Sequence, residues 1–210
     1  SVIELGAQVF ANCSGLKNVK IGNSVASMGK YAFSGSNSAK ASKIKSIEIP
    51  QSVKTIGMFA FSDCVYLKSV KLNEGLLEIG FATFNGCSAL SSINFPDSIE
   101  WIGDFAFDHC SSLTCSTITL PKEIKQIGGD SYIKLDSTNG SYDTQVEVDA
   151  ARRAVLGTHV FYDCATSSLT AFAIDSSNQY YMVKDGILYT KNTSADACVP
   201  SDSKAVSSLL

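Results

Sequence analysis

The chain has 210 residues, of which 45% are apolar and 18% are charged, and its formal net charge is −3. This composition is typical of one ordinary folded domain, and no apolar run approaches the ~20 residues that a membrane-spanning helix needs. The mild acidity argues against nucleic-acid binding, which favours basic surfaces.

A short motif recurs along most of the chain: an apolar residue, Gly, and then Phe four residues after the Gly. In residues 56–72 (IGMFAFSDCVYLKSVKL), Cys follows three residues after the Phe, and a short run with alternating apolar residues follows the Cys. Successive Phe residues lie 23, 28, 23, 23 and 54 residues apart, a period typical of a leucine-rich-repeat type solenoid. The positions expected to form a structural column are Phe10, Phe33, Phe61, Phe84, Phe107 and Phe161, with Cys13, Cys64, Cys87, Cys110 and Cys164.

The run after each Cys is expected to form one rung of a parallel sheet. In residues 67–72 (LKSVKL), Val70 and Leu72 point one way while Ser69 and Lys71 point the other. A run this short is stable only when other rungs stack above and below it. The sequence therefore predicts about six stacked rungs over residues 1–175, with a parallel sheet on the concave face. The Gly of each motif is expected to serve a tight bend or a close backbone approach.

The motif resembles the repeat of the BspA-like leucine-rich repeat family, which in outline is apolar-x-x-Ile-Gly-x-x-Ala-Phe-x-x-Cys-x-x-Leu-x-x-Ile-x-Ile-Pro. Residues 102–110 (IGDFAFDHC) and 56–64 (IGMFAFSDC) match it almost position for position. The resemblance extends from residue 3 to about residue 175, apart from one insertion. The departures are Ser36 in place of Cys, and Val9 and Thr83 where the family favours Ala.

Five of the seven cysteines occupy one repeat position and are expected to be buried free thiols. Neighbouring rungs lie ~4.8 Å apart, so parallel Cβ vectors miss the ~3.8 Å separation that a disulfide prefers. Cys115 and Cys198 lie outside the column and are the only plausible pair. No closely spaced Cys/His cluster predicts a zinc site, and no cofactor is expected.

Two segments depart from the repeat. Residues 129–155 are an insertion of about one repeat length, which is either a decorated loop or a recognition element. Its carboxylates do not have the spacing of an EF-hand loop. Residues 176–210 are predicted to form a hairpin that turns at Asp185-Gly186, followed by a tail. The resemblance implies that this hairpin caps the end of the core.

The outward residues of the rungs form the candidate binding surface, which is basic at its N-terminal end and small and neutral at its C-terminal end. It contains no aromatic anchor of the kind that interface hot spots favour. It is therefore either a solvated face or a weak site for acidic or polyhydroxy ligands. Trp101 is expected to be exposed on the convex side, where it is a candidate contact for a ligand or a neighbouring subunit. The candidate residues are Lys17, Lys20, Lys45, Glu48, Lys68, Lys71, Asn94 and Trp101.

Catalysis is not expected. The only histidines, His109 and His159, are expected in surface turns, and the thiols near them face inward, which leaves no Cys–His nucleophilic pair.

Two functions remain open. The first is a non-catalytic recognition module that binds protein or glycan partners through the solenoid face or the insertion; the resemblance implies an extracellular or cell-surface location and a role in adhesion. The second is a rigid spacer or a subunit of a larger assembly. The chain starts inside a repeat, with no signal peptide and no cap before Leu5, which predicts a piece of a longer protein whose first rung accepts further repeats or another chain.

Overall fold

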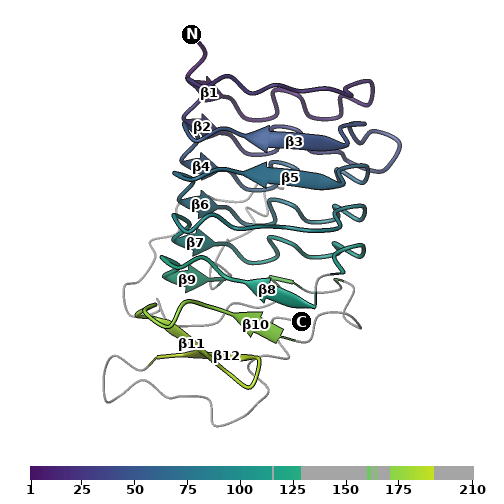
Figure 1. Ribbon diagram of the computed structural model, residues 1–210. Coiled ribbons are helices and arrows are strands. Elements are labelled where there is room, and N and C mark those ends of the chain that lie inside the picture. The colour runs from purple at the N-terminus through teal and green to yellow at the C-terminus, as the bar shows by residue number, and fades with distance from the viewer. Residues whose placement is uncertain (115, 129–159, 162–163, 165–170, 192–210) are drawn as a thin grey trace, which may run out of the picture.

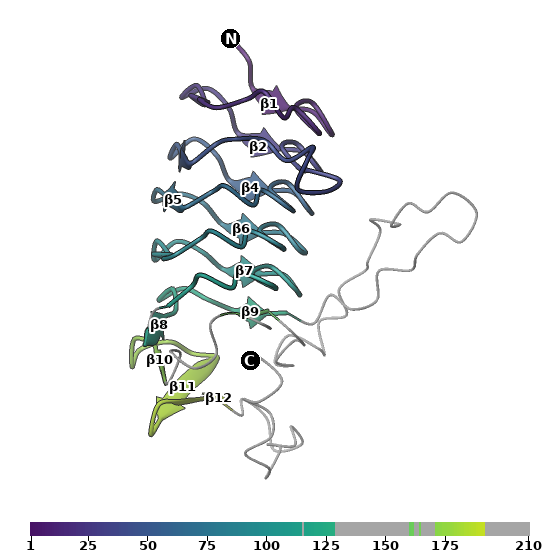
Figure 2. The ribbon, with the colours of Figure 1, turned by 90° about the vertical axis from the view of Figure 1, so that its right-hand side faces the viewer.

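The computed structural model describes residues 1–114, 116–128, 160–161, 164 and 171–191. In these residues the chain winds into rungs that stack in sequence order from the N-terminal end (Figure 1). The same stacking is seen from the side in Figure 2. The predicted solenoid of leucine-rich-repeat type is therefore confirmed. The predicted insertion 129–155 and the tail after residue 191 lie outside the described residues.

The longest sheet is formed by two-residue strands that immediately precede the repeated Gly. Its strands are parallel throughout, and each places its second residue toward the core. The repeat pattern does not predict this sheet. In sheet order, its six strands are β1 (Glu4–Leu5), β2 (Ser27–Met28), β4 (Thr55–Ile56), β6 (Glu78–Ile79), β7 (Trp101–Ile102) and β9 (Gln126–Ile127).

The Gly that follows these strands allows close approach of neighbouring backbones, as predicted. A Cβ atom on Gly57 would lie 2.8 Å from the Met28 carbonyl oxygen, and one on Gly80 would lie 2.8 Å from the Ile56 carbonyl oxygen. Real Cβ atoms do not come this close to backbone, so only Gly fits at these positions.

The strands predicted after each Cys form two separate pairs on another face. β3 (Ser46–Ile49) pairs with β5 (Ser69–Leu72), and β8 (Thr117–Thr119) pairs with β10 (Ala171–Ala173), both in parallel. Among the described residues, an isolated bridge from Ser69 to Ser92 lies between the two pairs. The predicted parallel pairing of these runs is confirmed, and in the described part of the chain it is divided between two pairs of strands. In the fifth repeat, Ile118 of β8 follows Leu113 by five residues, whereas Val70 of β5 follows Leu67 by three, so β8 comes two residues late in its repeat.

The phenylalanine column forms the centre of the core. The rings of Phe33 and Phe61 stack with centroids 5.1 Å apart and planes 4° apart, and the stack continues through Phe84 at 5.4 Å. Phe107 and Phe161 extend it, and these five rings are fully buried. Only Phe10, in the first rung, is partly exposed. The regular spacing follows from the rung spacing of ~4.8 Å, because each rung contributes one ring.

The thiol column is buried beside the rings, apart from its first member. Cys64, Cys87, Cys110 and Cys164 are buried free thiols, whereas Cys13 is exposed, so the prediction was wrong for Cys13. Cys87 Sγ donates a hydrogen bond to the Phe61 carbonyl at 3.2 Å, and the other buried thiols make the same bond to the preceding rung. Among the described residues, no earlier rung covers Cys13 or offers it that carbonyl. Cys115 and Cys198 lie outside the described residues.

A hairpin follows the last rung, as predicted. β11 (Tyr181–Lys184) and β12 (Ile187–Thr190) are antiparallel and joined by Asp185 and Gly186. Both turn residues have positive φ, 54° and 79°, as a type I′ turn requires.

The hairpin contacts the last strand of the long sheet. The Ile127 N–H of β9 donates to the buried Tyr181 hydroxyl at 3.1 Å. Asn178 Nδ2 donates to the Lys122 and Ile124 carbonyls, at 2.8 and 2.9 Å. Backbone groups at the edge of β9 thus find partners in the segment 178–181.

Candidate functional site

The candidate surface is built on β3 and β5, whose residues alternate between solvent and core. In both strands the first and third residues are exposed and the second and fourth are buried. The parallel register places Ser46 beside Ser69 and Glu48 beside Lys71. Because each outward residue has a neighbour one rung away, the exposed side chains form columns that run along the solenoid.

One column contains an ion pair. Lys71 Nζ lies 2.7 Å from Glu48 Oε1, and Asn73 Nδ2 donates to the same oxygen at 2.9 Å. These hydrogen bonds, from Lys71 and then Asn73, hold the pKa of the Glu48 carboxyl below its ordinary value. Both charged groups are well exposed, so the pair adds little stability, but it neutralises two charges on this face.

A second column contains lysines without an acidic partner. The Lys68 N–H donates to the Lys45 carbonyl at 2.8 Å, which holds these two exposed residues on adjacent rungs. The Lys43 N–H donates to the Leu16 carbonyl at 2.8 Å and so brings Lys43 beside Lys17 of the first rung. In the described part of the chain, none of these lysines forms an ion pair. We call Lys17, Lys43, Lys45 and Lys68 the lysine patch.

Tyr66 borders the lysine patch, and it was not among the candidate residues predicted from the sequence. Ser42 Oγ lies 3.7 Å from Cys64 Sγ, so the segments leading into β3 and β5 already run side by side there. Lys43 directly follows Ser42, and Tyr66 lies two residues after Cys64. The tyrosine is 43% exposed. No repeat signal reveals it, because the tyrosine occurs at this position in one rung only.

The first rungs are basic although the whole chain is acidic. Residues 1–72 contain nine lysines and three acidic residues, a formal charge of +6. Residues 73–210 contain eight basic and 17 acidic residues, a formal charge of −9. The lysine patch therefore lies at the positive end of a polarised chain.

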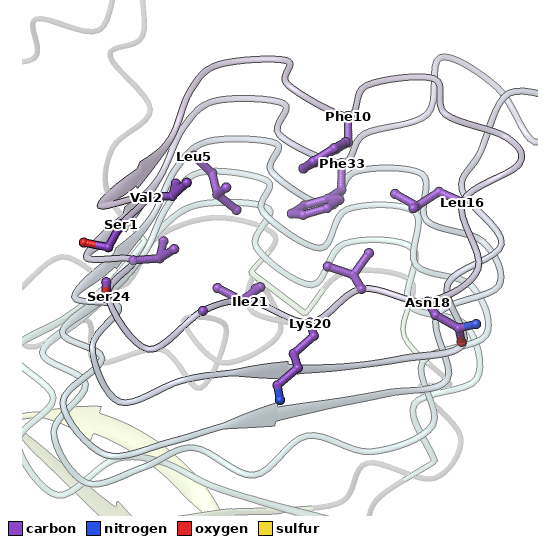
Figure 3. A pocket seen from close by; sticks show the side chains of 13 residues that line it. Ser1, Val2, Leu5, Phe10, Leu16, Asn18, Lys20, Ile21, Ser24 and Phe33 are labelled. Atoms are coloured by element: carbon purple, nitrogen blue, oxygen red, sulfur yellow. The ribbon is translucent and has the colours of Figure 1, made fainter.

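The remaining candidate residues do not join the patch. Lys20 is exposed on the first rung and points away from the core (Figure 3), and Asn94 is exposed on the fourth rung. Trp101 belongs to β7 of the long sheet, where it is half-buried between Glu78 and Gln126. The structure thus places Trp101 on a different face from the lysines (Figure 1).

Within the described residues, His109 and the neighbouring Cys110 thiol do not show the features of a nucleophilic pair. His109 lies in a turn, is exposed as predicted, and has Nδ1 2.7 Å from Asp108 Oδ1. Burial raises the pKa of the neighbouring Cys110 well above its ordinary value, whereas a reactive thiolate needs a lowered pKa. His159 lies outside the described residues. Within the described ranges, no three His, Cys, Asp or Glu side chains gather to hold a metal ion.

A row of half-buried rings crosses four rungs and was also missed. The rings of Tyr31 and Phe59 stack at 4.8 Å, and those of Phe81 and Phe105 follow at 5.3 and 5.5 Å. Tyr31, Phe59 and Phe105 have φ near 58°, 56° and 57°, which bulky residues rarely adopt. In the fourth rung the residue with positive φ is Ala82, at 50°, and the ring of the row belongs to Phe81, one residue earlier. The signal in the sequence is an aromatic residue one or two positions after the Gly.

The N-terminal end of the stack is apolar. A cavity of about 500 Å³ opens there, and Leu5, Phe10, Leu16 and Ile21 are among its lining residues (Figure 3). Phe10 stacks on Phe33 with ring centroids 5.2 Å apart. Val2, Ile3 and Val9, which belong to the same rung, are 62%, 67% and 47% exposed. We call this surface the N-terminal end face.

Stacked short strands, a shared phenylalanine column and an exposed ladder of polar side chains define a leucine-rich-repeat solenoid. The chain belongs to the BspA type leucine-rich repeat family, whose model matches six copies over residues 1–42 and 35–168. No curated protein matches the chain at a significant level.

Several solved structures are similar to the chain. A leucine-rich repeat protein from Bacteroides ovatus is 27% identical, with a TM-score of 0.46 over 60% of this chain and 37% of that one. A leucine-rich repeat protein from T. pallidum is 28% identical, with a TM-score of 0.40 over 62% and 47%. The pneumococcal vaccine antigen PcpA is 20% identical, with a TM-score of 0.45 over 90% and 32%. The chain spans less than half the length of each of these proteins.

The structure also bears on membrane insertion. In the described part of the chain, no helix has the length and apolar character needed to cross a membrane.

Proposed function

We propose that the chain is a non-catalytic recognition module that binds a protein or glycan partner through the exposed face of β3 and β5. The observation that carries this proposal is the lysine patch, in which cationic side chains on successive rungs have no acidic partner among the described residues. A surface side chain with only a structural role gains nothing from such an arrangement.

The rigidity of the rungs supports the proposal. Rung-to-rung hydrogen bonds such as Lys68 N to Lys45 O fix the backbone under the patch, and the stacked Phe33 and Phe61 rings fix the core behind it. A surface fixed before binding loses less conformational freedom when the partner arrives. Solenoids of this class present extended surfaces, which suit elongated partners. A cell-surface location is part of the proposal and rests on the family resemblance.

A binding screen tests the proposal. The chain is presented to a glycan array and to a panel of matrix proteins, with thermally unfolded chain as the control. The screen is repeated with residues 129–155 replaced by a short Gly/Ser linker. Binding that survives the replacement assigns the partner to the rungs, and binding that disappears assigns it to the insertion. If the folded chain binds nothing in either panel, the recognition proposal is wrong.

A structural role is the second candidate, and the N-terminal end face favours it. Val2 lines the apolar cavity there, and Ile3 and Val9 of the same rung are also exposed; exposed apolar surface of this kind often marks a contact with another surface. Light scattering over a range of chain concentrations tests this role. Self-association that is lost in Val9→Lys but kept in Leu77→Lys, a matched exposed position elsewhere, would support it. A monomer at every concentration would remove self-assembly through this face.

A further inference from the structure

We infer that the lysine patch and Tyr66 together bind a linear acidic polysaccharide, with sulfate or carboxylate groups on its sugars. This inference rests on the proposed recognition function and names the chemical class of the partner.

Two neighbouring columns of side chains on β3 and β5 differ in their charges. At the third position of β3 and β5, Lys71 faces Glu48 and forms an ion pair of 2.7 Å. One residue before each strand, Lys68 stands beside Lys45 instead, with their backbones joined at 2.8 Å. Like charges directly opposite each other in a sheet are destabilising. The chain therefore keeps two like charges on neighbouring rungs, and an anionic ligand would relieve their repulsion.

The geometry of the patch favours an extended ligand. Its four lysines come from three successive rungs, which are ~4.8 Å apart, so the charges are spread along the solenoid axis. A small anion could neutralise one or two of them, whereas a chain with repeated anionic groups can reach all of them. Lysine is a point charge on a flexible stem, so it tolerates variation in the spacing of those groups.

The other side chains of this face favour sugar over peptide or nucleic acid. Asn18, Ser46, Ser69 and Ser92 are exposed and offer hydroxyl and amide groups to the hydroxyls of a sugar. Tyr66 supplies one amphipathic ring beside them. Single-stranded nucleic acid requires a series of stacking rings, and peptide hot spots favour buried Trp, Tyr and Arg anchors. Among its described exposed residues, this face has one aromatic ring and no arginine.

The test compares binding of dextran sulfate, polygalacturonate and neutral dextran to the intact chain and to two double variants. Lys45→Gln with Lys68→Gln removes two charges from the patch. Lys54→Gln with Lys184→Gln removes two exposed charges elsewhere. We expect both acidic polymers to bind and neutral dextran not to bind. The patch variant should bind about tenfold or more weakly and with a shallower dependence on salt, while the control variant stays within about twofold.

Two further variants separate sugar recognition from simple charge attraction. Tyr66→Ala should weaken binding of polygalacturonate, whereas Tyr66→Phe should keep it, because the ring and not the hydroxyl contacts the sugar. Glu48→Gln should tighten binding, because it removes one negative charge and releases Lys71 from its ion pair. All variants are compared by thermal unfolding, and those in the patch should be as stable as the parent chain or slightly more stable.

Other results would overturn the inference. Equal loss in the patch and control variants would show attraction by overall charge only. Polyglutamate or single-stranded DNA that binds as tightly as polygalacturonate, without sensitivity to Tyr66→Ala, would assign the patch to another class of polyanion. If no acidic polysaccharide binds while the broader screen finds a partner, this inference fails and the recognition function stands. If neither experiment finds a ligand, both proposals fail.

Discussion

The Cys87 thiol is both a packing group and a hydrogen-bond donor. It is fully buried, and its Sγ donates to the Phe61 carbonyl of the preceding rung at 3.2 Å. The same carbonyl also accepts from the Cys64 N–H at 3.1 Å. Burial raises the pKa of Cys87 well above its ordinary value, so the proton needed for donation is retained. The repeated Cys therefore joins neighbouring rungs through a polar contact as well as by filling space.

Replacing this thiol should cost stability, whereas replacing the exposed one should not. We expect Cys87→Ala to lower the free energy of unfolding by about 1–3 kcal/mol, because it removes a buried hydrogen bond and leaves a small void. Cys13→Ala is the matched control at the same repeat position and should change it by less than about 0.5 kcal/mol. Urea denaturation followed by circular dichroism measures both. Equal effects would show that the column position does not matter.

The sequence predicts which residues form the columns, but it predicts only some of the contacts that these residues make. The Phe and Cys columns are predictable because each recurs once per repeat. The acceptor of the Cys87 thiol is not, since a backbone carbonyl of another rung leaves no side-chain signal. Tyr66 and the lysine patch become a unit only through the register of β3 and β5, because lysines near residues 17 and 68 are far apart along the chain.

At the scale of elements, the long sheet depends on the glycine that follows each strand. Its strands are two residues long, with one inward and one outward side chain, so no alternation can reveal them in the sequence. What the sequence does contain is the repeated Gly, whose close approach the rung spacing requires. Gly6 holds the same position in the first rung, but nothing lies within 4 Å of a Cβ placed there.

This difference makes a matched pair of substitutions. Gly57→Ala should destabilise the fold by about 1–3 kcal/mol, because the added methyl group would meet the backbone of the previous rung, which cannot move aside. Gly6→Ala should be neutral, or stabilise by about 0.4–1 kcal/mol through a less flexible unfolded chain. Thermal and urea unfolding of both variants measure the difference. A tolerated Gly57→Ala would contradict the close packing of the rungs.

The hairpin is the second element with a prediction of its own. Asn178 donates to the Lys122 and Ile124 carbonyls, and its Oδ1 accepts from the Tyr180 and Tyr181 N–H groups. It is the residue that joins the segment before β11 to the segment before β9. The sequence shows only the turn at Asp185-Gly186, because these partners lie more than 50 residues away.

Asn178→Ala should therefore loosen the end of the stack. We expect a loss of about 2–3 kcal/mol, because buried carbonyl and N–H groups lose their partners. Gln179→Ala, at the exposed neighbouring position, should change little. Hydrogen exchange at the Ile127 amide, which donates to the Tyr181 hydroxyl, should accelerate in Asn178→Ala and not in the control. Unchanged exchange would mean that the hairpin is held by other contacts.

Across the whole molecule, several buried groups have pKa values that are raised above their ordinary values. Burial raises the pKa of Cys64 to about 12 from an ordinary value of 9.0, and raises those of Cys87 and Cys110 as well. Burial also raises the pKa of the Tyr181 hydroxyl to about 12, partly offset by its hydrogen bond from Ile127. These groups come from the third rung through to the hairpin, so their effect belongs to the entire stack.

Their shared shift gives a definite sign for the dependence of stability on pH. Well below pH 9.0 each of these buried thiols keeps its proton in both the folded and the unfolded chain, so pH has little effect on stability through it. Above that value the unfolded chain loses protons that the folded chain retains, so rising pH favours unfolding. Each group that is deprotonated only in the unfolded chain contributes a slope of about 1.4 kcal/mol per pH unit.

We therefore expect the free energy of unfolding to fall steeply once the pH passes about 9. Urea denaturation at intervals from pH 7 to 10.5, under reducing conditions, measures the slope. Cys64→Ala should make the alkaline part of the curve shallower by up to the contribution of one thiol, even though it lowers stability at pH 7. A curve that stays flat to pH 10.5 would mean that solvent reaches the thiol column, and a buried column is what the stacked rungs require.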